Sequence, residues 1–187
     1  MTTVAAILER RLGLSADALG PAAVAAAVRA RLLALGSPDP ATYPARLSDP
    51  RELAALADAV VVPETWFFRY PASFRFFAEW AAPRRPVRVL CVPCSTGEEA
   101  YSIAATLGVG GGRVDAVDVS ERAVAAATRG EYPASAFRET GPGGCVTPVG
   151  DRFAVTDDVR RMVTVRVGNL LDPGFLLAEP PYDAVFC

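Results

Sequence analysis

Residues 87–107 read VRVLCVPCSTGEEAYSIAATL, and this stretch decides the fold of the chain. The run 87–92 is apolar, short and rich in β-branched residues, which predicts a buried parallel strand. Small residues from Pro93 to Gly97 then predict a tight loop, and 98–107 continues with apolar residues at helical spacing. A strand, a glycine loop and a helix in this order expose backbone N–H groups at the helix start, where a ligand can approach them.

The helix begins with an acidic pair, Glu98 and Glu99. The helix dipole stabilises carboxylates at this end, but they would repel a pyrophosphate group. They suit a ligand that carries an amine or sugar hydroxyls, and S-adenosylmethionine carries both. A glycine loop of this kind can also be no more than a turn.

A second strand is predicted from Arg113 to Asp118, its last residue. Asp118 follows Gly97 by about 20 positions, the spacing at which doubly wound nucleotide sites place a ribose ligand. An aspartate here can also simply begin a helix, since Ser120 is a suitable N-cap for 121–129 and Gly130 follows the end of that helix. Taken together, the glycine loop and Asp118 favour a nucleoside cofactor over packing alone.

Composition narrows the possible chemistry. All 19 basic residues of the 187 are arginine, because the chain contains neither lysine nor histidine. A Schiff-base lysine, a histidine general base and a histidine metal ligand are therefore excluded. The formal net charge is −2 and no basic tract is present, so we expect no nucleic-acid partner.

The 4 cysteines do not form a convincing redox or zinc motif. Cys91 and Cys94 have redox spacing, but they fall in a strand and a loop, whereas a thioredoxin-like pair opens a helix. Cys145 and Cys187 are isolated, so we expect no metal site. No signal-peptide core is present and no run reaches the roughly 18 apolar residues of a membrane span, which predicts a soluble cytoplasmic protein without membrane insertion.

The order of elements predicts two domains. Residues 1–82 form an N-terminal helical domain with an aromatic junction segment, 83–86 form a linker, and 87–187 form an α/β domain with a small β insertion at about 138–156. Helices are predicted at 2–12, 22–35, 40–47, 50–60, 98–107 and 121–129, and further strands at 163–167 and 181–187.

Arg69 and Asn169 each allow more than one interpretation. Arg69 lies in an aromatic segment, where it can reach into a cleft and bind a carboxylate bidentately or lie over the aromatic rings. Asn169 follows the strand 163–167 on the ligand side of a parallel sheet. Its amide can cap a turn, hold neighbouring backbone or read an adenine edge.

A series of sequence blocks resembles the CheR class of chemotaxis-receptor methyltransferases. The blocks are Glu64–Arg69, Cys94–Ser102, Asp118–Ser120, Ala127–Tyr132, Asn169–Leu171 and Tyr182–Cys187. They occur in the family's order and cover nearly the whole chain. The wording of Val62–Arg69 also resembles the WspC-like branch, which is attached to surface-sensing pathways.

The resemblance implies a protein-glutamate O-methyltransferase that acts in chemosensory adaptation. The cofactor would be S-adenosylmethionine, the product S-adenosylhomocysteine, and the partner the cytoplasmic helical domain of a methyl-accepting chemoreceptor. By position, Thr65 and Arg69 would contact the cofactor, and Arg69 would also hold the substrate carboxylate as the catalytic residue. Glu99 would contact the methionine or ribose end of the cofactor, and Asp118 would bind its ribose hydroxyls. Asn169 and Leu170 would contact the adenine. The alternative is a non-catalytic module that binds the cofactor, its product or a signalling partner.

The chain departs from the family pattern at Pro63, where family members usually have asparagine. The family also continues after the Phe-Cys pair, here Phe186–Cys187, with an Arg-Asn pair, a tyrosine and further strands. We therefore expect an α/β fold with the first half of a Rossmann-like methyltransferase sheet, in the order 3-2-1-4, and one side of the fourth strand uncovered. In this form we expect weak cofactor binding and no methyl transfer. The family's β insertion touches the receptor, and hairpin signals at 145–155 match it. The dense glycine and proline at 141–144 are also consistent with a disordered loop, and we favour the hairpin.

Overall fold

The computed structural model describes residues 3–36, 39–138, 141 and 143–187, which divide into two compact units. The first unit comprises Met1–Val62, Val119–Glu121 and Asn169–Ala178, and the second comprises Pro63–Asp118, Arg122–Gly168 and Glu179–Cys187. The chain thus passes into the second unit at Pro63, before the linker expected at 83–86. The reason is that the aromatic segment packs into the core of the sheet.

The first unit is helical. Its helices are α1 (Val4–Leu12), α2 (Ala16–Leu19), α3 (Pro21–Ala34), α4 (Tyr43–Arg46) and α5 (Pro50–Val60), with a 3₁₀ turn at Pro40–Thr42. Local signals set several ends: the Asp49 side chain accepts a hydrogen bond from Arg51 N at 2.9 Å, and Gly13 ends α1 with φ +69°. A buried charged group joins three of these helices, since Glu52 accepts from Arg31 at 2.9 and 2.7 Å and from the Tyr43 hydroxyl at 2.7 Å.

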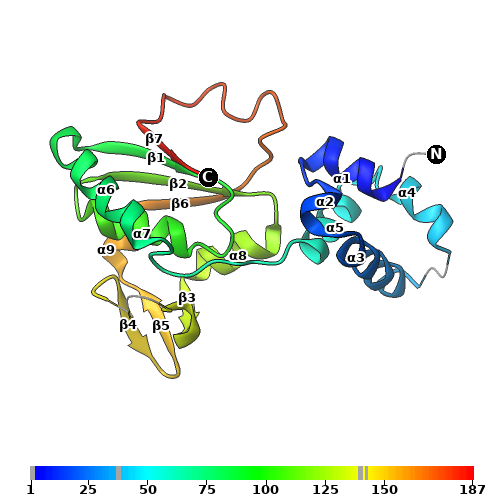
Figure 1. Ribbon diagram of the computed structural model, residues 1–187, viewed down its shortest axis with the longest axis horizontal. Coiled ribbons are helices and arrows are strands. Elements are labelled where there is room, and N and C mark those ends of the chain that lie inside the picture. Colours follow the sequence, from blue (N-terminus) through cyan, green and yellow to red (C-terminus); the bar gives the residue numbers. More distant parts are fainter. Residues whose placement is uncertain (1–2, 37–38, 139–140, 142) are drawn as a thin grey trace. The chain divides into compact units, whose positions relative to one another are not determined.

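The second unit is built on a four-stranded parallel sheet (Figure 1). Its strands are β1 (Val87–Cys91), β2 (Gly112–Asp118), β6 (Val163–Val167) and β7 (Ala184–Phe186). They lie in the order β6-β2-β1-β7, which confirms the predicted order 3-2-1-4. The helices of this part of the chain are α6 (Pro71–Ala81), α7 (Glu98–Leu107), α8 (Glu121–Arg129) and α9 (Asp157–Arg160), with a 3₁₀ turn at Ala82–Arg84.

Helix α6 is absent from the sequence prediction. Pro71 occupies its first turn, and the buried side chains Phe74, Phe77 and Ala81 recur at helical spacing. They join the core formed by α7 and the sheet residues that point to the same face, among them Val89. The dense aromatic composition of this segment obscured a helical period that was present in the sequence.

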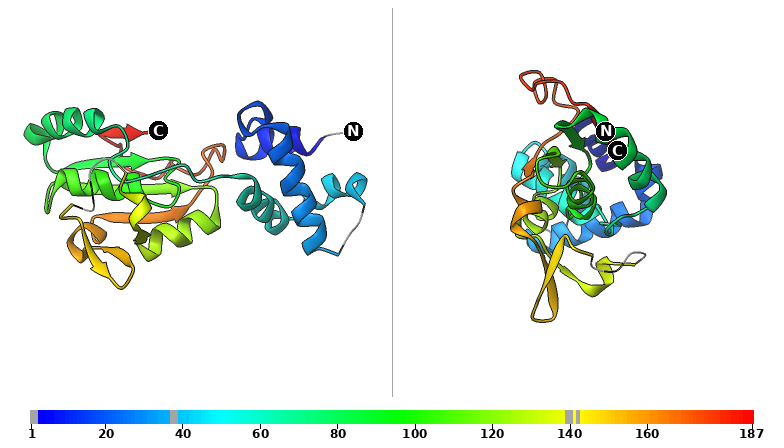
Figure 2. Two further views of the ribbon diagram at one scale, coloured as in Figure 1. Left: turned by 60° about the horizontal axis from the view of Figure 1, so that its bottom comes forward. Right: turned by 90° about the vertical axis from the view of Figure 1, so that its left-hand side faces the viewer.

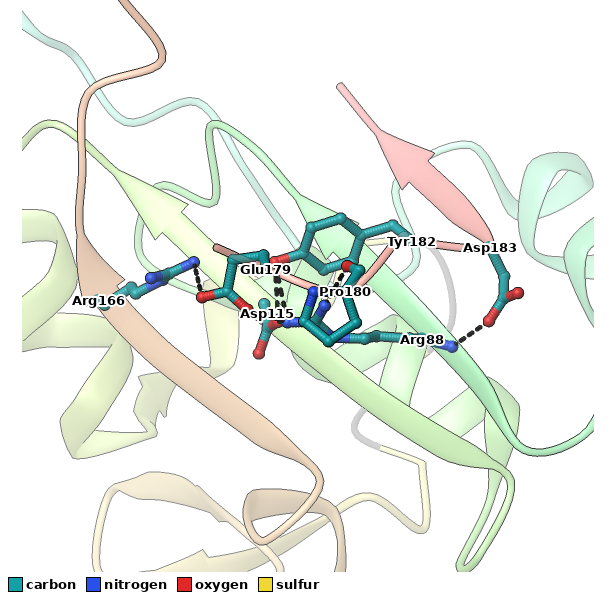
Figure 3. Close-up of polar contacts among 7 residues, drawn as sticks. All are labelled: Arg88, Asp115, Arg166, Glu179, Pro180, Tyr182 and Asp183. Atoms are coloured by element: carbon teal, nitrogen blue, oxygen red, sulfur yellow. Dashed lines mark hydrogen bonds and ion pairs between the residues drawn. The ribbon is translucent and has the colours of Figure 1, made fainter. Parts of the chain in front are cut away.

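The opposite face of the sheet carries charged side chains (Figure 3). Arg88 on β1 pairs with Asp115 on β2 and with Glu179, both at 2.5 Å, and Glu179 also pairs with Arg166 on β6 at 3.0 Å. The Tyr182 hydroxyl donates to Asp115 at 2.9 Å, and the centroid of its ring lies 4.2 Å from the Arg88 guanidinium carbon. These contacts fasten the segment that leads into β7 across the neighbouring strands.

A three-stranded antiparallel sheet forms the β insertion (Figure 2). Strands β4 (Val146–Val149) and β5 (Arg152–Val155) pair as a hairpin, as predicted, and β3 (Glu131–Pro133) adds to β5 from the other side. The insertion therefore begins at β3, which a 3₁₀ turn at Ala134–Ala136 follows, and not at 138. Residues 139, 140 and 142 of the expected insertion lie outside the described residues. Among the helices that are described, none has the length and apolar character needed to cross a membrane.

Candidate functional site

The glycine loop after β1 is held in a fixed turn. Cys94 N donates to Val117 O at 2.8 Å and Gly97 N donates to Cys94 O at 3.0 Å. Gly97 has φ +97°, and a Cβ there would lie 2.8 Å from Ala127 Cβ and 2.9 Å from the Tyr132 hydroxyl. Only glycine fits this position, because both the backbone angle and the neighbouring atoms exclude a side chain.

Asp118 ties this loop to the end of β2. Its carboxylate is only 4% exposed, and Oδ2 accepts a hydrogen bond from Ser95 N at 2.8 Å. Ser95 itself has φ +49°, a left-handed conformation that is uncommon for a residue with a side chain. The structure therefore brings together the two sequence features, glycine loop and acidic strand end, on which the prediction of a nucleoside site rested.

The acidic pair at the start of α7 separates into two environments. Glu98 is 6% exposed and accepts from the Thr96 hydroxyl at 2.7 Å, so it supports the loop from within. Glu99 is half-buried, and its Oε2 accepts from the Cys91 thiol at 3.5 Å. Burial raises the pKa of Glu99, while the Cys91 hydrogen bond and the charge of Arg69 oppose that rise. Glu99 is thus the carboxylate of the pair that a ligand can meet.

Arg69 lies over aromatic rings and also acts on Glu99. Its guanidinium carbon is 4.5 Å from the Trp66 ring centroid and 5.1 Å from that of Tyr70, and one terminal nitrogen donates to Glu64 O at 2.7 Å. The turn around it is unusual, since Phe68 and Tyr70 have φ +54° and +62°. The aromatic contact is one of the two interpretations open from the sequence. Carboxylate binding by Arg69 stays a prediction.

The remaining predicted residues divide between the units. Thr65 is half-buried in the second unit, in the same turn segment as Arg69. Asn169 and Leu170 belong to the first unit, so they are not part of the group that the second unit brings together. Asn169 Oδ1 accepts from Leu171 N at 2.9 Å and its amide nitrogen donates to Arg11 O at 2.7 Å, so the side chain both caps a turn and holds neighbouring backbone.

Two buried polar atoms at this site suit a ligand. Within the residues that the structure describes, Ser95 Oγ and Arg69 Nε have no hydrogen-bond partner. Buried polar atoms are seldom left unpaired unless a water or a ligand serves them. With the carboxylates of Glu99 and Asp118, this donor and acceptor set fits a ligand that carries an amine, a carboxylate and sugar hydroxyls.

Sequence reasoning did not single out Ser95 or Tyr132 as site residues. The Ser95 position in the glycine loop was a usable signal, because loop N–H groups there face the end of the next strand. The sequence contains no comparable signal for Tyr132. Its hydroxyl donates to Thr96 O at 2.7 Å from a strand that is distant in sequence. It supports the loop through tertiary structure alone.

The thiols near the site are not reactive nucleophiles. Cys91 and Cys94 are both free and buried. Burial raises the pKa of Cys94 to about 12 and that of Cys91 well above its ordinary value, and neighbouring carboxylates add to both shifts. Both sulfurs therefore keep their protons at neutral pH, which is unlike the thiolate of a redox pair.

The parallel sheet, the glycine loop after its first strand and the buried acid at the end of its second strand define a Rossmann-like α/β domain. Comparison with known families is more specific. The family description "CheR methyltransferase, SAM binding domain" matches residues 63–187, and the chain belongs to this family. The resemblance found in the sequence blocks is thereby confirmed.

Similar proteins agree with this assignment. The chain is 44% identical to the probable biofilm formation methyltransferase WspC of Pseudomonas aeruginosa, over 97% of this chain and 47% of that protein. It is 40% identical to the protein of the same name from Pseudomonas putida, over 96% of this chain and 46% of that protein. Chemotaxis protein methyltransferase 2 of Pseudomonas aeruginosa is 32% identical, over 85% and 62%. The chain thus spans about half the length of the WspC proteins that it matches.

Proposed function

We propose that this chain binds S-adenosylmethionine at the glycine loop, and that the full-length protein transfers its methyl group to glutamate side chains of a chemoreceptor. The observation that carries the proposal is the hydrogen bond between Ser95 N and the buried Asp118 carboxylate. It joins the glycine loop to the acid at the end of β2, where nucleoside sites of doubly wound sheets are built.

The family resemblance gives each side chain a role in this proposal, and the chemistry of the side chains agrees with these roles. Asp118 accepts hydrogen bonds from the ribose hydroxyls, and Glu99 binds the amine or ribose end of the cofactor. Arg69 and Thr65 contact the cofactor from the turn before α6, and Arg69 also holds the acceptor carboxylate. Asn169 and Leu170 contact the adenine; their part rests on the family resemblance.

The bound cofactor would supply an electrophilic methyl group. The acceptor glutamate is already ionised at neutral pH, so the transfer needs no general base, in agreement with a chain that contains no histidine or lysine. What the protein has to provide is orientation and the exclusion of water. The partly buried Arg69 guanidinium, fixed by Glu64 O and the Trp66 ring, is suited to orient a carboxylate.

The names of the relatives favour a chemosensory substrate. They include a biofilm formation methyltransferase and a chemotaxis methyltransferase. A receptor of a surface-sensing or chemotaxis pathway, methylated at glutamates of its cytoplasmic helical domain, is therefore the proposed acceptor, and methylation there would serve adaptation.

Calorimetry with S-adenosylhomocysteine tests the cofactor site. We expect Asp118→Ala to weaken binding at least about tenfold, as the loss of a charge-assisted contact does. The control is Asp151→Ala, because Asp151 is an exposed aspartate of the β insertion, and we expect it to bind like the wild type. Equal affinities for Asp118→Ala and the wild type would remove Asp118 from the site.

Transfer of a tritiated methyl group from S-adenosylmethionine to receptor cytoplasmic domains tests the reaction. With the full-length protein, we expect label that is released by base, as a glutamate methyl ester requires. Binding of S-adenosylhomocysteine without any such label would instead indicate a non-catalytic module that recognises the cofactor or its product.

A further inference from the structure

Glu99 is held by a side chain to which the proposed function gives no role. Cys91 is the last residue of β1 and is fully buried, between its neighbours Ala116 on β2 and Phe186 on β7. Its thiol donates to Glu99 Oε2, with 3.5 Å between sulfur and oxygen. Within the part of the chain that the structure describes, no other side chain donates a hydrogen bond to this carboxylate.

The geometry makes Cys91 a dependable donor. Its backbone is fixed by two neighbouring strands, and Glu99 lies in the first turn of α7, so both groups stand on rigid elements. Burial and the nearby carboxylates keep the proton on the sulfur, because they raise the pKa of Cys91 well above its ordinary value. The thiol therefore remains a donor throughout the neutral pH range.

We propose that Cys91 is a positioning residue for the cofactor site, whose thiol fixes the Glu99 carboxylate through Oε2 and so leaves Oε1 to accept from the cofactor. This inference rests on the proposed function, in which Glu99 binds the amine or ribose end of S-adenosylmethionine. A half-buried carboxylate with a single donor depends strongly on that donor, since it has few other contacts to hold its orientation.

Loss of the thiol should also change the pH dependence of binding. The Cys91 hydrogen bond and the Arg69 charge are the influences that lower the pKa of Glu99 against the effect of burial. The other ionisable groups nearby are Cys94, which stays protonated, and Asp118, whose charge acts on Cys91 and Cys94. Without the thiol, Glu99 takes up a proton at higher pH, and affinity for a ligand that needs the carboxylate falls there.

The test compares variants of Cys91 by calorimetry with S-adenosylhomocysteine at several pH values between about 5 and 8. We expect Cys91→Ala to bind about three- to tenfold more weakly than the wild type, and Cys91→Ser, which keeps a donor, to bind within about twofold of it. The affinity of Cys91→Ala should also begin to fall at a higher pH. Cys145→Ala removes a buried thiol of the β insertion and should leave binding unchanged.

Several outcomes would overturn the inference. One is a Cys91→Ala variant that binds like Cys145→Ala, and another is a Cys91→Ser variant that loses as much affinity as Cys91→Ala. Cys91→Val, which fills the space of the thiol without a donor, replaces Cys91→Ala if that variant unfolds. Glu99→Gln and the wild type separate this inference from the proposed function. Wild-type affinity in Glu99→Gln removes Glu99 from the cofactor site and the inference with it, whereas weak binding there with intact binding in Cys91→Ala refutes the role of Cys91 alone. A wild-type protein that binds no S-adenosylhomocysteine refutes the proposed function itself.

Discussion

Replacement of Arg88 by methionine should destabilise the second unit by about 2 kcal/mol. Arg88 pairs with Asp115 and Glu179, and the three side chains are 25%, 17% and 26% exposed (Figure 3). Breaking a fully buried pair costs about 3–5 kcal/mol, whereas an exposed pair contributes about 0–1 kcal/mol. Exposure of about a fifth places this group between those limits. Methionine keeps an apolar side chain at this position but removes the cation of Asp115 and leaves Glu179 with Arg166 alone.

The assay is urea unfolding followed by tryptophan fluorescence. The chain has 2 tryptophans, Trp66 and Trp80, and both lie in the second unit, so the signal reports on that unit. The control is Arg113→Met, because Arg113 is the neighbour of Arg88 on β2 but is exposed, and we expect it to change stability by less than about 0.5 kcal/mol. Equal stability of the two variants would refute the view that the charged group fastens the segment before β7. Faster amide exchange in β7 of Arg88→Met would support it.

Three further predictions follow from single contacts. In urea unfolding, Gly97→Ala should destabilise the second unit by about 2–4 kcal/mol, because the backbone would be strained and the new Cβ would lie 2.8 Å from Ala127 Cβ. The control Gly110→Ala has φ +78° but nothing near its Cβ, so it should cost only about 1 kcal/mol. Glu99→Gln should raise the melting temperature at pH 7, because burial raises the pKa of Glu99 in the folded state and the ionised carboxylate therefore destabilises the fold. At pH values above the ordinary pKa of 4.5, the folded state binds more protons than the unfolded state. The gain in melting temperature should therefore shrink as the pH falls towards 4.5. Arg31 lowers the pKa of Glu52, so the ionised carboxylate stabilises the first unit above pH 4.5, and this stabilisation is lost as the pH falls below that value. In unfolding followed by circular dichroism, Glu52→Gln should lose about 2–3 kcal/mol of stability at pH 7, and its stability should depend less on pH in the acid range. The same dependence on pH as in the wild type would contradict this prediction.

Most secondary structure was predictable because its signals are local. The strand at Val163–Val167 and the helix at Glu98–Leu107 have the predicted bounds, since β-branched runs and helical spacing are read within one segment. The end of α1 at Gly13 was equally predictable, because a glycine in the left-handed conformation commonly ends a helix. Helix α6 was missed where aromatic composition masked its period, and β3 was missed because it is short and its partner β5 lies far along the chain.

The candidate site also combines features that the sequence predicts with features that depend on tertiary contacts. The sequence alone indicated Asp118 and the glycine loop, because topology brings the ends of adjacent parallel strands to one edge of a sheet. It could not separate Glu98 from Glu99, since both are acids at the start of one helix. Their environments differ through contacts with Thr96 and Cys91 that depend on how the loop turns.

What the sequence by itself determined is most of the elements, the order of the parallel strands and the family, because each rests on short-range patterns and on blocks of residues in a fixed order. Only the tertiary structure decided which groups meet across the sheet. The Arg88 contacts with Asp115 and Glu179, and the hydrogen bond from the Tyr132 hydroxyl to Thr96 O, join segments that are distant in sequence. The physical reason is that hydrogen bonds and ion pairs depend on separations of a few ångströms, and those separations are fixed by packing of the whole unit and not by any local pattern.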